Sequence, residues 1–403
     1  MNELVRVLYL FDPPSDIEAI MRLDLTLSSL VIYFGTSIST SSTRIIIVGA
    51  GPAGLLAACC LLSRERNYEI LLLESRDSPG HLSENDLPRS YSLGLNIRGQ
   101  NAFKYFDHKN RPGNILSLLR EEGIESDAFF LHFGRRSIQL RKRNNKENEK
   151  DKVTPTLLLS RDKITTVLLS ILNNVYANEN LFLARFNTKV VGIDTKRRRC
   201  KLEDGSEEVY DLLIGADGVN SIVRKSLVGD PNNGNKEQAS STAFVCEEKV
   251  LPGKFKVMLH PNPPDLDPYA VHALTSNKAD YNLFLIPSVY RKTCVLVSWR
   301  TASAPPIFLE SSSPEIIRDS IKEFFPAFGE PDLSSIGQLF RQRPSVALTI
   351  RCNRYHDVDS RILLVGDAAH STGDNRIVCD SFNRVTLMLH QDRHLWPRHS
   401  CLT

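Results

Sequence analysis

The chain has 403 residues, 41% of them hydrophobic and 24% charged, so it can bury a large core and form more than one domain. A net charge of +3, with Lys and Arg spread along the chain, argues against a nucleic-acid-binding protein. The eight cysteines include no C-x-x-C pair, and no His stands at metal-ligand spacing, so no metal site is predicted. A reduced intracellular protein is expected, cytoplasmic by default, with an organellar location left open.

Residues 1–43 form an N-terminal extension ahead of the first predicted strand. The apolar stretch at 25–38 is interrupted by polar residues and is shorter than the run of about 18 apolar residues that spans a membrane. Several acidic residues in the extension argue against a transit peptide. We therefore expect no membrane segment here.

The first strong motif follows an apolar strand at 45–48 and opens a helix at 55–62. Its letters, Gly49-Ala50-Gly51-Pro52-Ala53-Gly54, have the Gly-x-Gly-x-x-Gly spacing. Gly49 allows a tight turn, Gly51 allows a pyrophosphate to approach the backbone, and Gly54 allows close packing of helix on strand. The helix N-terminus then offers N–H donors to phosphate. This context predicts a dinucleotide-binding site.

The next strand, at 69–73, ends in Glu74, twenty positions after Gly54. A carboxylate at this position accepts hydrogen bonds from the ribose of an adenosine and repels a 2′-phosphate. The site is therefore predicted to take FAD or NAD rather than NADP.

The middle of the chain alternates helices and strands. A loop at 75–86 precedes a strand within 87–96, and Ser160 is a candidate helix cap. Further on we predict helices at 99–106 and 115–122, a strand at 128–133, a charged loop at 141–152, a strand and helix within 157–171, and a hairpin at 200–206 with Asp204-Gly205 at its tip.

Strand patterns then recur at 242–246, 255–259, 270–274, 281–287 and 293–299, before a helix at 314–325 and strands at 346–351 and 361–365. Consecutive strands of this kind predict a mostly antiparallel sheet. The predicted fold is α/β, a Rossmann-like FAD-binding domain with an interleaved substrate domain. Its parts are 44–237 with an insertion near 126–158, a substrate domain at 238–345, a return to the first domain at 346–373, and an atypical tail at 374–403.

Two later motifs carry a family resemblance. Tyr210–Ser221, which contains Asp217-Gly218, and Ile362–His370, which contains Gly366-Asp367, resemble the internal signatures of the single-component FAD-dependent aromatic hydroxylases. Arg89-Ser90-Tyr91-Ser92-Leu93, with Ser160-Arg161, most resembles the kynurenine 3-monooxygenase branch. The resemblance runs from about residue 44 to residue 373.

The resemblance implies bound FAD, with NAD(P)H as a transient co-substrate because no second Gly-x-Gly-x-x-Gly occurs. It implies hydroxylation of a small aromatic or related ring by O2 through a flavin hydroperoxide, with the protein supplying orientation and water exclusion. It places Arg89 and Arg161 near the flavin, Asp217-Gly218 beside the phosphates, and a buried Asp367 at the ribityl chain and pyrophosphate. No catalytic residue is assigned, and His370 needs no catalytic role. The cofactor-binding residues expected are Gly49, Gly51, Pro52, Ala53, Gly54, Glu74, Arg89, Arg161, Asp217, Gly218, Gly366 and Asp367.

The chain departs from the family pattern in two places. After Gly373 the family continues with a Gly-rich turn, whereas residues 374–381 contain no glycine. Where the kynurenine branch has an arginine that holds the substrate carboxylate, this chain has Phe129. These departures leave two alternatives beside the monooxygenase, a truncated or non-catalytic FAD-binding remnant and a flavin oxidase or reductase on the same scaffold.

Overall fold

The structure is a computed structural model that describes residues 42–63, 68–79, 91–107, 115–141, 154–176, 180–228, 244–300, 307 and 313–372. The chain divides into two compact units. The first comprises the described residues of 1–124, 156–249 and 348–372, and the second those of 125–155 and 250–347. Arg89, the charged loop at 142–152 and the tail at 374–403 lie outside the described residues, as does all but the end of the N-terminal extension.

The first unit is built on a six-stranded sheet with the order β18-β19-β12-β1-β2-β8. The strands are β1 Thr43–Val48, β2 Tyr68–Leu73, β8 Phe182–Arg185, β12 Leu212–Gly215, β18 His356–Asp357 and β19 Ile362–Leu364. All neighbouring pairs are parallel except β18–β19. The chain passes from β1 to β2 on one side and later returns to β12 on the other, so the strand order reverses at β1, where ligands bind in open α/β sheets.

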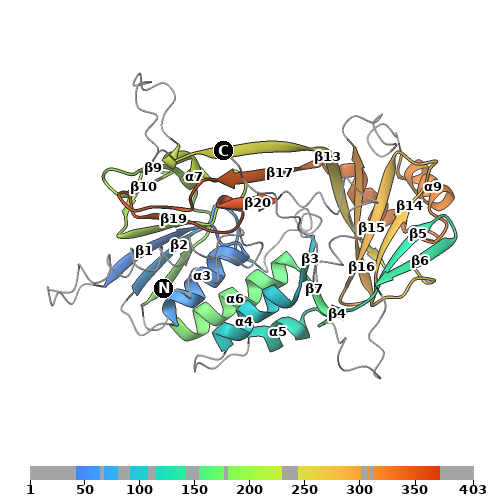
Figure 1. Cartoon of the computed structure of the whole chain (residues 1–403), viewed down its shortest axis with the longest axis horizontal. Coiled ribbons are helices and arrows are strands. Elements are labelled where there is room, and N and C mark those ends of the chain that lie inside the picture. Colours follow the sequence, from blue (N-terminus) through green and yellow to red (C-terminus); the bar gives the residue numbers. More distant parts are fainter. Residues whose placement is uncertain are drawn as a thin grey trace, which may run out of the picture. The chain divides into compact units, whose positions relative to one another are not determined.

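Both faces of this sheet are covered, which explains why its strands read as continuous apolar runs. Ile45 and Ile47 face a core shared with four helices, α3 Pro52–Leu62, α4 Ile97–Asp107, α5 Ile115–Glu121 and α6 Arg161–Tyr176. Ile46 and Val48 face a second core with the three-stranded sheet of β9 Val190–Asp194, β10 Arg199–Leu202 and β11 Glu207–Val209. Figure 1 shows α3 and α6 side by side on their face of the sheet.

Smaller elements of the first unit complete the frame around the sheet. They are β3 Ser92–Leu95, which pairs antiparallel with β7 Thr156–Ser160, the short helix α7 Ile222–Leu227, the 3-10 turn η4 Gly366–Ala368, and β20 His370–Thr372. The predicted hairpin is present, with β10 and β11 antiparallel and Gly205 at a φ of +86° in its turn. Ser160 caps α6 as predicted, because its Oγ accepts the N–H of Lys163 at 3.3 Å.

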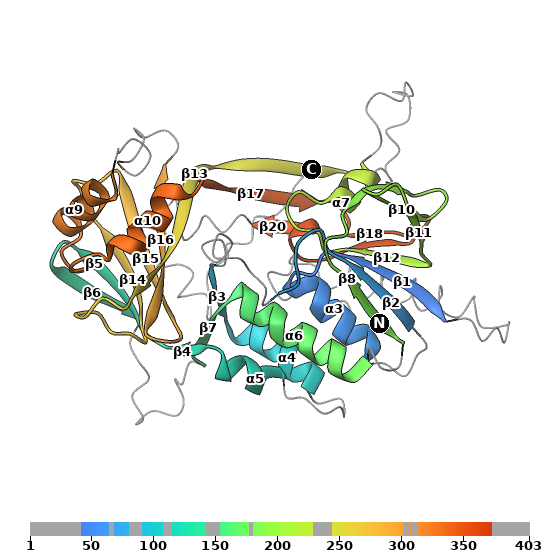
Figure 2. The ribbon, with the colours of Figure 1, turned by 180° about the vertical axis from the view of Figure 1, so that it is seen from behind.

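The second unit is a mostly antiparallel sheet backed by two helices. Its strands follow the order β13-β16-β15-β14-β5-β6, and Figure 2 shows α9 and α10 beside them. The elements are β5 Phe129–Phe133, β6 Arg136–Arg141, β14 Val271–Thr275, β15 Tyr281–Ser288, β16 Lys292–Arg300, α9 Pro314–Phe324 and α10 Leu333–Arg341. β14 and β5 are parallel and the other printed pairs antiparallel. Trp299, Phe325 and Phe328 lie in the core between sheet and helices.

The strand pattern was wrong in detail at two places. The separate strands expected at 242–246 and 255–259 are one long strand, β13 Cys246–Pro261, because its polar middle residues are exposed yet still extended. Arg141 ends β6 rather than starting a loop. β13 and β17 Ser345–Cys352 each contribute residues to both units, and β4 Ile124–Ser126 stands where the chain first leaves the first unit.

Candidate functional site

The Gly-rich turn lies at the carboxyl end of β1, against the end of β12. Gly49 has a φ of +106°, and a Cβ added there would lie 2.4 Å from the carbonyl oxygen of Ala216. A Cβ on Gly54 would lie 2.1 Å from the carbonyl oxygen of Gly49. Both obstacles are backbone atoms, so no side chain is accommodated at either position.

The N-terminus of α3 is left open by this turn. Gly51 is its N-cap, with extended backbone and no side-chain cap, and Pro52 takes the first helical position, where its missing N–H costs nothing. The first turn contains no acidic residue. The N–H groups of that turn and the positive end of the helix dipole therefore remain available to an anion.

Glu74 stands at the end of β2 beside the same turn. Its Oε2 accepts the backbone N–H of Ala50 at 2.8 Å, and its Oε1 accepts the Nε–H of Arg76 at 3.0 Å. Burial alone would raise the pKa of this carboxyl, but the bonds from Arg76 and Ala50 outweigh it and lower the pKa below its usual value. The side chain is therefore a fixed carboxylate with unused acceptor positions.

Arg161 connects the first motif with the third. It opens α6, and its guanidinium lies 3.1 Å from where a Cβ of Gly51 would be. The same guanidinium attracts the carboxylate of Asp367 and so works to lower its pKa. A cation is thus placed between the Gly-rich turn and Asp367.

Gly366 and Asp367 lie in η4, directly after β19 and Val365. Gly366 has a φ of +59°, and its Cβ position would be 2.8 Å from the Cβ of Ala53, so the third motif packs on the first turn of α3. Asp367 is exposed, contrary to the expected buried carboxylate. Partial desolvation by the surrounding protein nevertheless raises the pKa of Asp367 against the pull of Arg161.

Asp217 has a use that the sequence did not predict. Its Oδ1 accepts the hydroxyl of Ser221 at 2.5 Å, and its Oδ2 accepts the backbone N–H of Ile222 at 2.6 Å. The carboxylate therefore caps α7, while burial raises its pKa against these bonds. Gly218, at a φ of +77°, has no atom within 4 Å of its Cβ position and leaves open space beside the loop.

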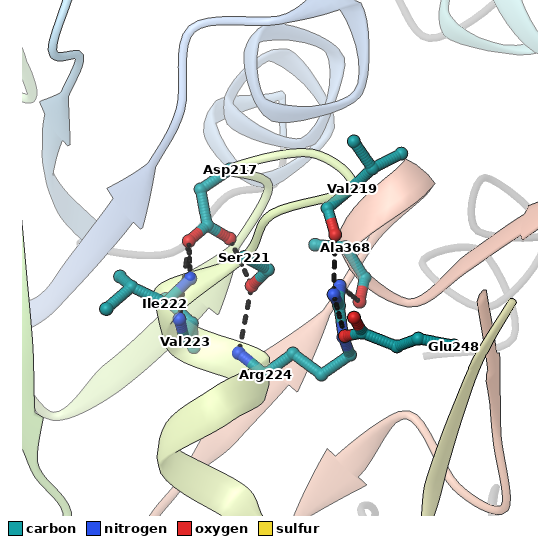
Figure 3. A network of polar contacts seen from close by, with 8 residues as sticks. All are labelled: Asp217, Val219, Ser221, Ile222, Val223, Arg224, Glu248 and Ala368. Carbon is teal, nitrogen blue, oxygen red and sulfur yellow. Dashed lines mark hydrogen bonds and ion pairs between the residues drawn. The ribbon is translucent and has the colours of Figure 1, made fainter. Parts of the chain in front are cut away.

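Arg224 holds the second and third motifs together, as Figure 3 shows. This side chain is fully buried; its Nη2 donates to the carbonyl of Val219 at 2.5 Å and to Glu248 at 2.6 Å. Its Nη1 donates to the carbonyl of Ala368 at 3.0 Å. One guanidinium therefore links the loop after β12 to the turn after β19.

Sequence reasoning missed Arg224 and its partner. The one local signal was a basic residue beside the apolar pair Ile222-Val223, three positions after Ser221. Its carbonyl partner Ala368 is 144 positions away along the chain, so no spacing rule could have related the two.

Phe129 lies in the second unit, in an aromatic cluster on β5. Its ring centroid is 5.9 Å from that of Phe284, and Phe130 stacks on His272 at 5.3 Å. His272 in turn pairs with His132, Nδ1 to Nε2, at 3.0 Å. Burial first, and then the neighbouring His272, lowers the pKa of His132 to about 4, so this imidazole is neutral. The local surroundings of Phe129 are thus aromatic rather than cationic.

The residues gathered in the first unit fit a dinucleotide such as FAD. An open helix N-terminus and Arg161 provide donors and positive charge for a pyrophosphate, and Glu74 and Asp367 provide acceptors for hydroxyl groups. Within the described ranges, no three His, Cys, Asp or Glu side chains come together as a metal site. No helix in that part of the chain is long and apolar enough to cross a membrane.

Comparison with known proteins agrees with this arrangement. The NAD(P)-binding Rossmann-like domain family matches residues 47–114. In sequence, the chain is 28% identical over 353 residues to kynurenine 3-monooxygenase acdD of Aspergillus candidus, covering 82% of this chain and 64% of that protein. The Neurospora crassa kynurenine 3-monooxygenase is 26% identical over 351 residues, with 81% and 64% coverage. The chain thus spans slightly less than two thirds of the length of these relatives.

Solved structures with the same fold include 2-methyl-3-hydroxypyridine-5-carboxylic acid oxygenase, with a TM-score of 0.60 and 18% identity over 82% of this chain and 76% of that one. A tetracycline destructase gives a TM-score of 0.53 and 16% identity over 84% and 78%. The fold is that of the flavoprotein hydroxylases. Within that class the chain is a homologue of the kynurenine 3-monooxygenases, so the resemblance stated from the motifs is confirmed.

Proposed function

We propose that this chain forms the FAD-binding and catalytic part of a monooxygenase that uses NAD(P)H and O2 to hydroxylate a small aromatic ring. The observation that supports this most is the meeting of three motifs, distant in sequence, at one edge of the parallel sheet. Gly49 touches Ala216, and Gly366 touches Ala53, so the loops after β1, β12 and β19 adjoin. The sequence relatives, named as kynurenine 3-monooxygenases, supply the reaction type.

Each residue has a role in the proposed complex. The N-terminus of α3, opened by Gly51 and Pro52, would bind the pyrophosphate, and Glu74 would bind the adenosine ribose. Arg161 would balance phosphate charge, and Asp367 would accept from the ribityl chain. When bound, FAD supplies hydride acceptance from NAD(P)H and activation of O2 for insertion of one oxygen atom. Arg89, outside the described residues, stays a predicted flavin contact.

The substrate class follows from the second unit. Kynurenine carries a carboxylate, and the position that the kynurenine branch is expected to fill with an arginine is Phe129, packed against Phe284. An aromatic ring without a carboxylate at that point is therefore the better candidate. We place kynurenine in the same panel as a comparison.

The test begins with the absorption spectrum of the purified 403-residue chain. We expect a flavin spectrum near one FAD per chain, substrate-stimulated NAD(P)H oxidation, and a product carrying one oxygen atom from 18O2. Gly54→Val is the matched control, because its side chain would meet the Gly49 carbonyl and prevent flavin binding. Two results would contradict the proposal. A colourless protein that FAD cannot reconstitute points to the remnant, and NAD(P)H oxidation with no oxygen inserted into any tested ring points to the oxidase or reductase.

A further inference from the structure

Two cysteines that are 106 positions apart in sequence face each other on neighbouring strands of the first unit. Cys246 begins β13 and Cys352 ends β17, and these strands are neighbours in the sheet. They run in opposite directions, as both ribbon views show (Figures 1 and 2). The two thiols contact each other through a side-chain hydrogen bond.

The strand register explains this contact. The backbone N–H of Asn353 donates to the carbonyl of Val245 at 3.1 Å, and the N–H of Val245 donates to the Oδ1 of Asn353 at 3.0 Å. In an antiparallel pair, the next opposed residues are then Cys246 and Cys352, at a position without backbone bonds between them, where side chains approach most closely. Directly opposed Cβ atoms there are about 4.5–5.5 Å apart, against about 3.8 Å in a disulfide. A small closure of the strands is enough to join them.

We propose that Cys246 and Cys352 are an oxidisable pair that closes to a reversible disulfide when a peroxide reaches the protein. Cys246 is half-buried and Cys352 is buried, so attack begins at Cys246. Hydrogen peroxide oxidises the Cys246 thiol to a sulfenic acid and releases one water. The Cys352 thiol then displaces hydroxide from that sulfur, forming the S–S bond and a second water. Two thiols are oxidised and one peroxide is reduced to two waters.

Closure is expected to be slow at neutral pH. Burial first, and then the hydrogen bond with Cys246, raises the pKa of the Cys352 thiol, so little thiolate is present to complete the bond. The closing rate should therefore rise with pH. A pair of unrelated surface cysteines that collide at random would lack this dependence on the buried partner.

The pair lies beside the network that joins the second and third motifs. Glu248, two residues after Cys246 on β13, receives Arg224, which holds the carbonyls of Val219 and Ala368. Drawing β13 toward β17 shifts the strand that carries Glu248. If the proposed function is right, closing the disulfide weakens FAD binding; this effect rests on the proposed function, whereas formation of the bond does not.

The experiment uses the full chain, reduced and then treated with hydrogen peroxide, alkylated and digested with trypsin. Trypsin releases Cys246 in the peptide 237–249 and Cys352 in the peptide 352–354, so a cross-link between these two peptides identifies the bond. We expect a loss of two of the eight thiols, the cross-linked peptide, and recovery of both thiols with dithiothreitol. Cys60→Ser, half-buried in α3, is the control that keeps the cross-link, while Cys246→Ser and Cys352→Ser each abolish it.

Either of two results overturns the proposal. Peroxide that converts Cys246 to a sulfinic acid without cross-linking shows that the strands do not close, and a cross-link to another cysteine shows that a different pair reacts. Flavin affinity is measured on the same samples. If the wild-type chain binds no FAD, the proposed function fails, but the peptide map still decides the disulfide.

Discussion

Replacing Arg224 with Met removes the guanidinium and keeps an apolar stem of similar length. The carbonyls of Val219 and Ala368 lose a charged donor, and each such bond contributes about 1.5–3 kcal/mol. Removing a buried charge recovers part of this loss, because its desolvation no longer opposes folding. We therefore expect the free energy of unfolding to fall by about 2–4 kcal/mol. Urea unfolding, followed by the fluorescence of Trp299 and the far-UV signal, measures it.

Glu248→Gln is the matched control for Arg224→Met. Its side chain is 44% exposed, so the ion pair with Arg224 contributes about 1 kcal/mol or less. We also expect Arg224→Met to weaken FAD binding at least about tenfold, equivalent to about 1.4 kcal/mol, because two loops of the site lose their common anchor. A Met variant that unfolds within 1 kcal/mol of wild type, with unchanged FAD affinity, would refute the role given to Arg224.

Three further predictions follow from the same contacts. Gly54→Ala should reduce FAD occupancy more than Gly134→Ala, measured by absorbance, because a Cβ at Gly54 meets the Gly49 carbonyl and one at Gly134 meets nothing within 4 Å; equal occupancy would contradict this. Glu74→Gln should lower the free energy of unfolding by about 1–3 kcal/mol at neutral pH. The folded pKa of Glu74 is depressed, so this difference should vanish as the pH falls below about 4.3, and a pH-independent difference in urea midpoints would argue against it. The pKa of His132 is depressed to about 4, so acid should destabilise the second unit by up to about 3 kcal/mol between about pH 6.5 and 4; His132→Gln should remove that dependence in urea titrations.

The sequence determined the local chemistry of this protein. Apolar runs ending in glycine and aspartate located β1, β12 and β19, and the Gly-x-Gly-x-x-Gly spacing located the start of α3. These signals are local because a tight turn, a helix N-terminus and a buried parallel strand each restrict the residues that can occupy them. The strand pattern also predicted the antiparallel sheet of the second unit.

The tertiary structure alone decided which distant residues meet. Asp217 turned to α7, since three donors of that helix end lie within its reach, and Asp367 became exposed at the edge of η4. Arg224 found its carbonyl partner 144 positions away, and Cys246 met Cys352 through the register of two strands. Such pairs depend on strand order and register, which are set by packing of the whole core and leave no periodic trace in the sequence.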